Sequence, residues 1–211
     1  MKTFDEHKTV RYLAATAMLG ALSFVLQLFE FPLPFLIPSF VEFDFSDLPA
    51  LVASFSMGPI SGVAVALIKN VLHLPMTTTG SVGELANFLL TATFVAIAGI
   101  VYRHYKTRSG ALAGSVAGAV AMSLLSVPIN YFLTYPIYYN FMPKEAILAA
   151  YQAIFPFVNS IYTCLWFFNA PFNLGKGLVI SLITFLIYKR IPPFIKGRKR
   201  EKKEKEEKEE K

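Results

Sequence analysis

The chain has 211 residues, of which 55% are hydrophobic and only 16% are charged, and its mean hydropathy is +0.50. A soluble domain carries about a quarter charged residues, so this composition excludes an ordinary soluble protein. It predicts an all-α integral membrane protein in contact with the lipid bilayer. The net charge of +6 is better explained by membrane topology than by nucleic acid. The single cysteine, Cys164, excludes an internal disulfide and a metal site built from cysteines.

The first membrane-spanning helix is predicted over residues 10–29, after a polar N-terminal segment, 1–9, that is not a removed signal peptide. Residues 30–46 cannot continue this helix, because three prolines interrupt them. They are nonetheless apolar and aromatic, so they must bury against something. We expect them to fold over the bundle as a lid, with an extended piece from residue 40, where apolar and polar residues alternate.

Residues 47–74 predict two shorter helices joined by a turn at Met57-Gly58-Pro59. Asp47 and Lys69 lie about equally far from this turn along their helices, so they should reach the same membrane surface and could pair. For Lys69 we therefore expect an ion pair with Asp44 or Asp47, or snorkelling, in preference to substrate binding.

Three longer apolar stretches complete the predicted bundle. The fourth span covers residues 83–105 and the fifth 110–133, where glycines recur every four residues in a pattern typical of close helix packing. The last span covers residues 169–190. Residues 134–168 are predicted to be an interfacial or re-entrant piece, because a short helix starts at Pro143 and is interrupted by Pro156.

The distribution of charge supports six spans. With six, both termini share one side with the basic loop that holds Arg103, Lys106 and Arg108, and the loops on the other side are acidic. The positive-inside rule then places both termini in the cytoplasm. We therefore expect a six-helix domain over 10–190 and a charged cytoplasmic tail over 191–211 that is disordered or a frayed helix and to which we assign no chemistry.

Polar residues at the predicted outer ends of three spans indicate a binding site. Glu84 and Asn87 lie three residues apart on one helix face, as do Asn173 and Lys176, and Asn130 lies near the outer end of the fifth span. A lysine inside an apolar span is costly unless it snorkels, pairs or binds a ligand. We predict an outward-facing pocket with apolar walls. The alternative is a structural Glu84–Lys176 pair, which is less favoured because buried pairs seldom add stability.

Other chemistry is not indicated. The three histidines are scattered, so no histidine metal site is predicted. The phosphate-binding loop of nucleotide-binding proteins is not found, and no span carries the acidic residues of a proton-driven pump. We therefore expect a protein that is not an enzyme and that, if it transports, draws its energy from elsewhere.

An ordered set of short motifs resembles the riboflavin-specific substrate-binding (S) components of energy-coupling factor (ECF) transporters. The motifs are Phe43-Asp-Phe-Ser-Asp-Leu-Pro-Ala50, Met57-Gly-Pro, Ile68-Lys-Asn70 with His73, Gly83-Glu-Leu-Ala-Asn87, and Asn173-Leu-Gly-Lys-Gly177. The resemblance extends from the first span to Arg190. It implies a six-helix protein in the plasma membrane of a prokaryote that binds riboflavin from outside as its transported ligand, with no other cofactor.

The resemblance also implies partners and site residues. The partners are one transmembrane coupling subunit and two cytoplasmic ATPases. The docking motif of the first helix matches Ala17 and Ala21, with Ala14 and Met18 on a neighbouring line. The flavin-contacting positions correspond to Glu84, Asn87, Asn173 and Lys176, and the first loop from Leu36 to Phe40 closes over the ring. Asn130 joins this set, or Asn140 takes its place.

The residue types suit a flavin. An Asn side chain can match an N–H donor and a carbonyl acceptor of the ring edge together, Lys can donate, and Glu84 can accept from ribityl hydroxyls. Apolar walls from the first loop and Tyr131 would hold the ring. Two alternatives remain: an S component for another vitamin such as thiamin or biotin, and a membrane scaffold or enzyme without transport. Lys176 argues mildly against cationic thiamin.

Overall fold

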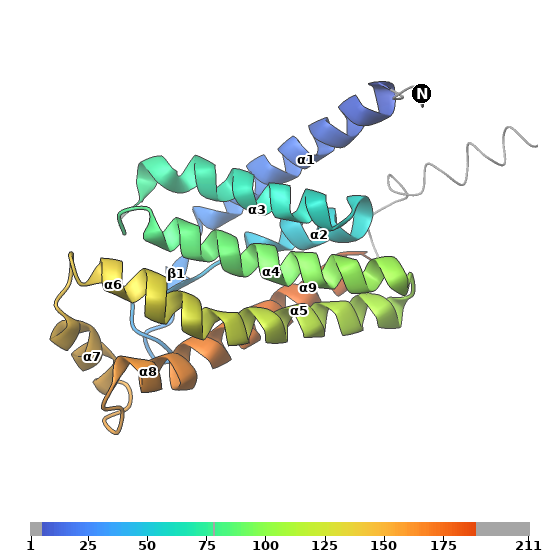
Figure 1. Cartoon of the computed structure of the whole chain (residues 1–211). Helices are drawn as coiled ribbons and strands as arrows, with labels where there is room; N and C mark the ends of the chain where they lie inside the picture. The colour runs from blue at the N-terminus through green and yellow to red at the C-terminus, as the bar shows by residue number, and fades with distance from the viewer. Residues whose placement is uncertain (1–5, 78, 189–211) are drawn as a thin grey trace, which may run out of the picture.

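The computed structural model describes residues 6–77 and 79–188, and helices account for most of them. Helix α1 (Glu6–Gln27) leads into a short antiparallel pair, β1 (Phe31–Pro32) and β2 (Glu42–Phe43), which lies in the first loop. Helices α2 (Asp47–Met57) and α3 (Pro59–His73) follow. A turn, η1 (Leu74–Met76), then precedes the long antiparallel helices α4 (Val82–His104) and α5 (Arg108–Ile129) (Figure 1).

The predicted break between the second and third helices is confirmed. Gly58 separates α2 from α3 with a φ of 109°, a backbone conformation that residues with a side chain rarely adopt. Pro59 begins α3, where its missing N–H is not needed. This turn and the loop between α4 and α5 lie at one end of the bundle (Figure 1).

The described residues contain five helices that are long and apolar enough to cross a membrane. These are Thr9–Gln27, Pro59–Met76, Val82–His104, Arg108–Tyr138 and Ile161–Ile187. The remaining predicted span corresponds to α2, which is apolar but has only 11 residues. At 1.5 Å per residue it covers about 16 Å, roughly half of a bilayer core.

The last two long helices extend further than predicted, because each passes through a proline. The fifth continues beyond residue 133 through a π turn, η2 (Asn130–Thr134), into α6 (Tyr135–Tyr138). The last begins before residue 169, with α8 (Ile161–Cys164) and a second π turn, η3 (Leu165–Asn169), ahead of α9 (Ala170–Tyr188). Each π turn ends two residues before a proline, Pro136 or Pro171. Such a widened turn accommodates a residue that cannot donate its backbone hydrogen bond.

Between these helices, α7 (Lys144–Gln152) is a separate short helix. It begins directly after Pro143 and ends before Pro156, as predicted. With 9 residues it is too short to cross a bilayer. It lies with α6 and α8 at the end of the bundle opposite the α2–α3 turn (Figure 1).

Two buried clusters hold the bundle together. The central one joins α2, α3, α4, α5 and α9, and includes Val65, Phe94 and Ile180. Here α4 and α5 approach so closely that a Cβ at Gly114 would lie 2.6 Å from the Ala98 carbonyl oxygen, which agrees with the predicted role of the repeated glycines.

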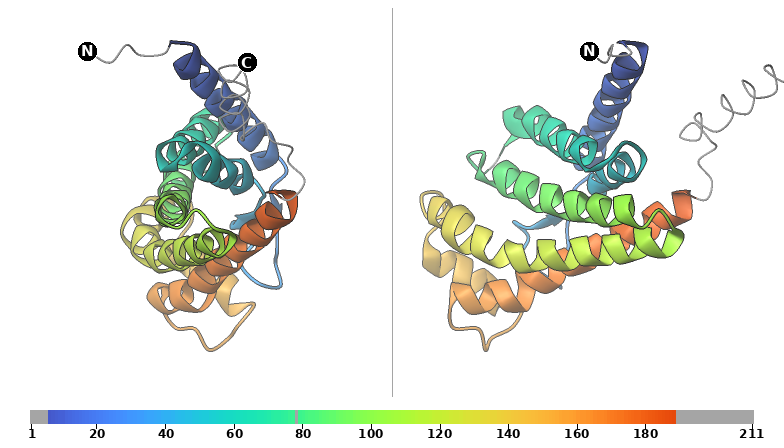
Figure 2. Two further views of the ribbon diagram at one scale, coloured as in Figure 1. Left: turned by 90° about the vertical axis from the view of Figure 1, so that its right-hand side faces the viewer. Right: turned by 45° about the vertical axis from the view of Figure 1, so that its right-hand side comes forward.

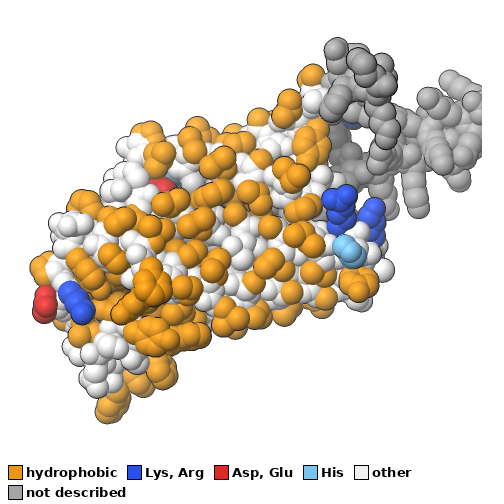
Figure 3. Space-filling view, viewed as in Figure 1, with side chains coloured by type: hydrophobic (Ala, Val, Ile, Leu, Met, Phe, Trp, Pro, Cys, Tyr) orange, Lys and Arg blue, Asp and Glu red, His pale blue; other side chains and the backbone are white. Residues whose placement is uncertain are grey.

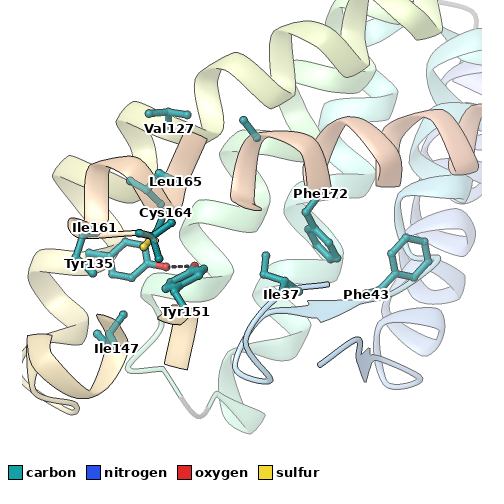
Figure 4. Close-up of a cluster of buried hydrophobic side chains, with 12 residues drawn as sticks. Ile37, Phe43, Val127, Tyr135, Ile147, Tyr151, Ile161, Cys164, Leu165 and Phe172 are labelled. Carbon is teal, nitrogen blue, oxygen red and sulfur yellow. Dashed lines mark hydrogen bonds between the residues drawn. The ribbon is translucent and has the colours of Figure 1, made fainter. Parts of the chain in front are cut away.

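The outer cluster joins α6, α7, α8 and α9 to the first loop (Figure 4). Ile37 and Phe43 of this loop are buried in it beside Phe172. The apolar loop is thus packed on the bundle, and β2 supplies the extended piece expected beyond residue 40.

The outer surface agrees with a membrane protein. The face shown in Figure 3 is largely hydrophobic; basic side chains gather at one end, and at the other a basic side chain lies beside an acidic one. Arg103, Lys106 and Arg108 are exposed in and beside the loop between α4 and α5. The predicted tail, 191–211, and the basic pair Lys189 and Arg190 lie outside the described residues.

Candidate functional site

A cavity opens between the first loop and the ends of α1, α3, α4, η2, α6 and α9. The space between these walls is about 1000 Å³, part of it open to solvent. Its walls combine aromatic side chains with amides and carboxylates. The lining residues from the long helices include Glu84, Asn87, Asn130, Asn173 and Lys176.

Six of the eight predicted substrate-binding residues line this cavity: the five just named and Phe40. Tyr131 and Leu36 do not line it and are 42% and 50% exposed. The ring of Tyr131 packs instead against Phe132 and Tyr162. Aromatic walls come from Tyr135, Tyr138 and Phe172, which the sequence reasoning did not single out.

Asn130 and Asn140 were alternatives for one position in the site. Asn130 lines the cavity, and its amide donates to the Ser126 carbonyl at 2.8 Å. Asn140 is exposed and outside the lining, and its amide donates to the Ile137 carbonyl. In this structure, only Asn130 of the two is placed to meet a ligand in the cavity.

The structural alternative, a Glu84–Lys176 pair, is not formed. The Lys176 ammonium donates to Asp44 Oδ2 at 2.8 Å and lies 3.5 Å from Asp47 Oδ2. Glu84 is engaged at the other side, where its Oε1 lies 3.1 Å from His73 Nδ1 and its Oε2 accepts from Thr77 at 2.9 Å. The two residues face one cavity from separate hydrogen-bond networks.

Lys176 belongs to a buried group of two lysines and two aspartates. Asp47 accepts from Lys69 at 2.6 Å and from Thr91 at 2.7 Å, which confirms the predicted pairing of Lys69. The backbone N–H of Ser46 donates to Asp44 Oδ1, so the end of the first loop is fixed to this group. Burial by itself would raise the pKa of Asp44, but the ammonium groups of Lys176 and Lys69 hold it below its usual value.

Asp44 was not anticipated as a partner of Lys176. The depth argument that paired Asp47 with Lys69 placed Asp47 near the outer surface, where Lys176 was also expected. The shared depth of Asp47 and Lys176 could therefore have indicated that these two residues lie close together. Asp44, in contrast, depends on how the first loop folds back on α9, which no local pattern indicates.

Further acidic groups stand at the edge of the cavity. Glu30 and Glu42 line it, and Glu30 Oε1 lies 3.9 Å from His73 Nε2. Partial burial, together with the nearby charge of Glu42, raises the pKa of Glu30 to about 7. Glu30 is therefore only partly charged at neutral pH, and Glu42 and Glu84 supply most of the acidic character of the cavity, since Lys176 is balanced by Asp44.

A tyrosine–asparagine chain supports the aromatic wall. Asn169 donates to the Tyr151 hydroxyl at 2.7 Å, and that hydroxyl lies 2.5 Å from the Tyr135 hydroxyl (Figure 4). Phe40 of the first loop meets the rings of Tyr138 and Tyr151 edge-on. The first loop and α7 are therefore joined through the same aromatic group.

The predicted docking residues lie on α1, and none of them lines the cavity. Ala14, Ala17, Met18 and Ala21 are all exposed, and Met18 is 73% exposed. Helix α1 packs on α2 and α3 with its other side, and its N-terminal part projects beyond the bundle (Figure 2). Within residues 6–77 and 79–188, no three His, Cys, Asp or Glu side chains are grouped to hold a metal ion.

Comparison with known proteins assigns the family. The model of the family described as "ECF transporter, substrate-specific component" matches residues 11–188. The chain belongs to this family. This S component is 35% identical to the riboflavin transporter RibU of Staphylococcus aureus (strain TCH60), covering 87% of this chain and 92% of that protein. It is 31% identical to the riboflavin transporter FmnP of Bacillus subtilis (strain 168), covering 90% and 96% of the two chains.

A solved structure agrees in fold. It is described as the S component of a bacterial ECF transporter, with a TM-score of 0.70 and 32% identity to this S component over 89% of this chain and 99% of that one. The family is a transporter component and both relatives are named transporters, in agreement with the prediction that the chain is not an enzyme.

Proposed function

We propose that this S component binds riboflavin and delivers it to an ATP-driven uptake transporter in the cell membrane. The observation that carries the proposal is the cavity itself, in which amides from α4, η2 and α9 face a set of aromatic walls. The names of the relatives supply the identity of the vitamin. Neither the walls nor the amides alone would select a flavin, but together they match a planar ring with a polar edge.

The assignments within the cavity follow from its chemistry. Asn87 and Asn173 can pair with the alternating donors and acceptors of the ring edge, and Glu84 can accept from ribityl hydroxyls. Phe40, Tyr138 and Phe172 would hold the ring faces. Lys176 has three N–H donors, and its contact with Asp44 uses one, so it can still donate to a ring carbonyl.

We further propose the arrangement in the membrane that the sequence predicts. Five long helices and the shorter α2 would form a six-helix domain with both termini in the cytoplasm and the cavity facing outward. The first loop would serve as the lid, since it both lines the cavity through Phe40 and is anchored by Asp44. Leu36, exposed at present, would approach the ring only if this loop moves.

Docking is proposed for the exposed side of α1. The small side chains of Ala14, Ala17 and Ala21, beside Met18, would let a helix of the transmembrane coupling subunit approach closely. Two cytoplasmic ATPases would supply the energy, because the sequence holds no phosphate-binding loop of the nucleotide-binding type.

Titration of the purified, full-length protein with riboflavin tests the proposal. We expect quenching of riboflavin fluorescence at about one ligand per protein. Asn87→Ala and Asn173→Ala should each weaken binding by about 10-fold or more, since a lost hydrogen bond that strands a ligand group costs about 1–3 kcal/mol. Asn140→Ala, which removes an exposed amide outside the cavity, is the matched control and should leave binding unchanged. If the protein does not quench the fluorescence of added riboflavin, the proposal is refuted.

Thiamin is the second candidate, because one observation favours it. Lys176 is neutralised by Asp44 and Asp47, whereas Glu42 and Glu84 leave the cavity acidic, which suits a cation. Adding thiamin or biotin in the same titration separates the cases. A vitamin that the cavity binds should displace riboflavin and restore its fluorescence at low concentration, whereas a vitamin that it does not bind should have no effect.

A further inference from the structure

Four buried side-chain atoms have no hydrogen-bond partner in the described part of the chain. They are Gln27 Oε1, Asn70 Oδ1, Ser115 Oγ and Thr134 Oγ1. Leaving such an atom unpaired costs about 1–3 kcal/mol, so native proteins rarely do so without a reason. Such atoms are satisfied by ordered water or by a ligand, and a ligand is indicated where the atoms line a binding cavity.

Two of the four residues line the cavity, and a third contacts a residue that does. Gln27 and Thr134 both line it, and they are 3% and 5% exposed. Asn70 does not line the cavity, but its amide donates to Asn87, which does. Only Ser115 belongs to a side chain with no such connection, because it lies on α5 outside the lining.

We propose that Gln27 and Thr134 are additional substrate-binding residues that contribute to the specificity of this site. The inference rests on the proposed function and adds to its contacts. Gln27 Oε1 can only accept, so the ligand must present an O–H or N–H to it. The Thr134 hydroxyl can both donate and accept. A ligand that carries a chain of hydroxyls and a ring N–H, as riboflavin does, can satisfy both.

The two residues come from different parts of the chain. Gln27 is the last residue of α1, and it lines the cavity together with Glu30 and His73. Ser23, one turn earlier on α1, donates to the Ser46 carbonyl and so fixes this end of the helix to the first loop. Thr134 is the last residue of the η2 π turn, which also carries Asn130 into the lining.

A merely structural role predicts the opposite behaviour on substitution. A polar side chain that supports the fold through hydrogen bonds destabilises the protein when it is removed. An unpaired buried atom is itself a cost, so its replacement by an apolar group of similar shape should leave the ligand-free protein as stable or make it more stable. Ligand affinity should nevertheless fall, and this combination of effects identifies a binding residue.

The test uses Gln27→Leu and Thr134→Val in the full-length protein, with riboflavin as the probe. We expect each substitution to raise the dissociation constant for riboflavin by about 10-fold without lowering the melting temperature of the ligand-free protein. Ser115→Ala removes an unpaired atom outside the cavity and should leave the dissociation constant within about twofold of the original. Thr134→Ser, which keeps the hydroxyl, should bind nearly as tightly as the unchanged protein.

The outcomes separate this inference from the proposed function. If the unchanged protein binds riboflavin but Gln27→Leu and Thr134→Val bind it equally well, the inference is wrong and the proposed function stands. A lower ligand-free melting temperature for either variant assigns a structural role to that residue and overturns its part in the inference. If the unchanged protein does not bind riboflavin, the proposed function fails first.

Discussion

Replacing Lys176 by Met removes an ammonium group from the buried charge network while keeping a side chain of similar length. In the structure this ammonium lies 2.8 Å from Asp44 Oδ2 and 3.5 Å from Asp47 Oδ2. The three residues are 6%, 2% and 1% exposed, in the order Lys176, Asp44 and Asp47. After the substitution, Lys69 alone would face two buried carboxylates.

The expected loss is large for a single substitution. Removing one partner of a buried ion pair typically costs about 3–5 kcal/mol, because the remaining charge has no compensation. In a protein of this size, each 1 kcal/mol lowers the melting temperature by roughly 2–4 °C. We therefore expect Lys176→Met to melt at least about 6 °C below the original protein. The measurement should be made without riboflavin, since Lys176 also lines the cavity.

A double-mutant cycle makes this prediction sharper. Asp44→Asn alone should also destabilise the protein, whereas the double variant Asp44→Asn/Lys176→Met should lose less than the sum of the two single losses, by about 1 kcal/mol or more. Melting curves followed by intrinsic fluorescence give all three values. If the two losses simply add, or if Lys176→Met melts with the original protein, the ion pair does not stabilise the fold as we argue.

Two further predictions concern pH and helix packing. Because the pKa of Glu30 is raised from the usual 4.5 to about 7, the folded state holds this proton more tightly than the unfolded state, and stability should fall as pH rises from about 4.5 to about 7. Glu30→Gln stays neutral, so its melting temperature should fall less over that range; equal pH profiles would contradict the assignment. Gly114→Val should push α4 from α5 and cost about 1–3 kcal/mol, because its Cβ would meet the Ala98 carbonyl oxygen at 2.6 Å. Gly175→Ala is its control on α9, where a Cβ has nothing within 4 Å, and it should be neutral or stabilising; similar melting temperatures for both variants would contradict the packing argument.

Much of the helical framework could be predicted from local sequence. Long apolar stretches, the Gly58-Pro59 turn and the glycine repeat on α5 each act within one element, so their structural meaning can be read without the rest of the fold. The pairing of Lys69 with Asp47 was also predictable, because both residues lie at fixed distances from one turn.

The contacts of the site were less predictable, for two physical reasons. Asp44 reaches Lys176 only because the first loop folds back across the bundle, and such a long-range contact leaves no periodic pattern. The second reason is that a proline usually ends a helix, so the sequence did not indicate that two helices continue through π turns before Pro136 and Pro171. Tyr131 was expected in the wall but lies within η2 next to Asn130, and neighbouring helical residues project about 100° apart, so Asn130 lines the cavity and Tyr131 does not. The wall is formed by Tyr135 and Tyr138, which lie beyond the turn.

The two π turns also bear on how this protein could acquire a different ligand. A π turn arises when one extra residue enters an α-helix. The five residues of such a turn complete about the same rotation as four residues of an α-helix, so the helix on either side keeps its direction and its faces. Deleting one residue between 130 and 134 would therefore change only which side chains the turn itself presents to the cavity, where Asn130 and Thr134 now lie. The helix would remain apolar and continuous, so insertion into a bilayer would be preserved. Gaps of one residue at these two turns, rather than substitutions, are therefore where divergence in ligand choice should be sought.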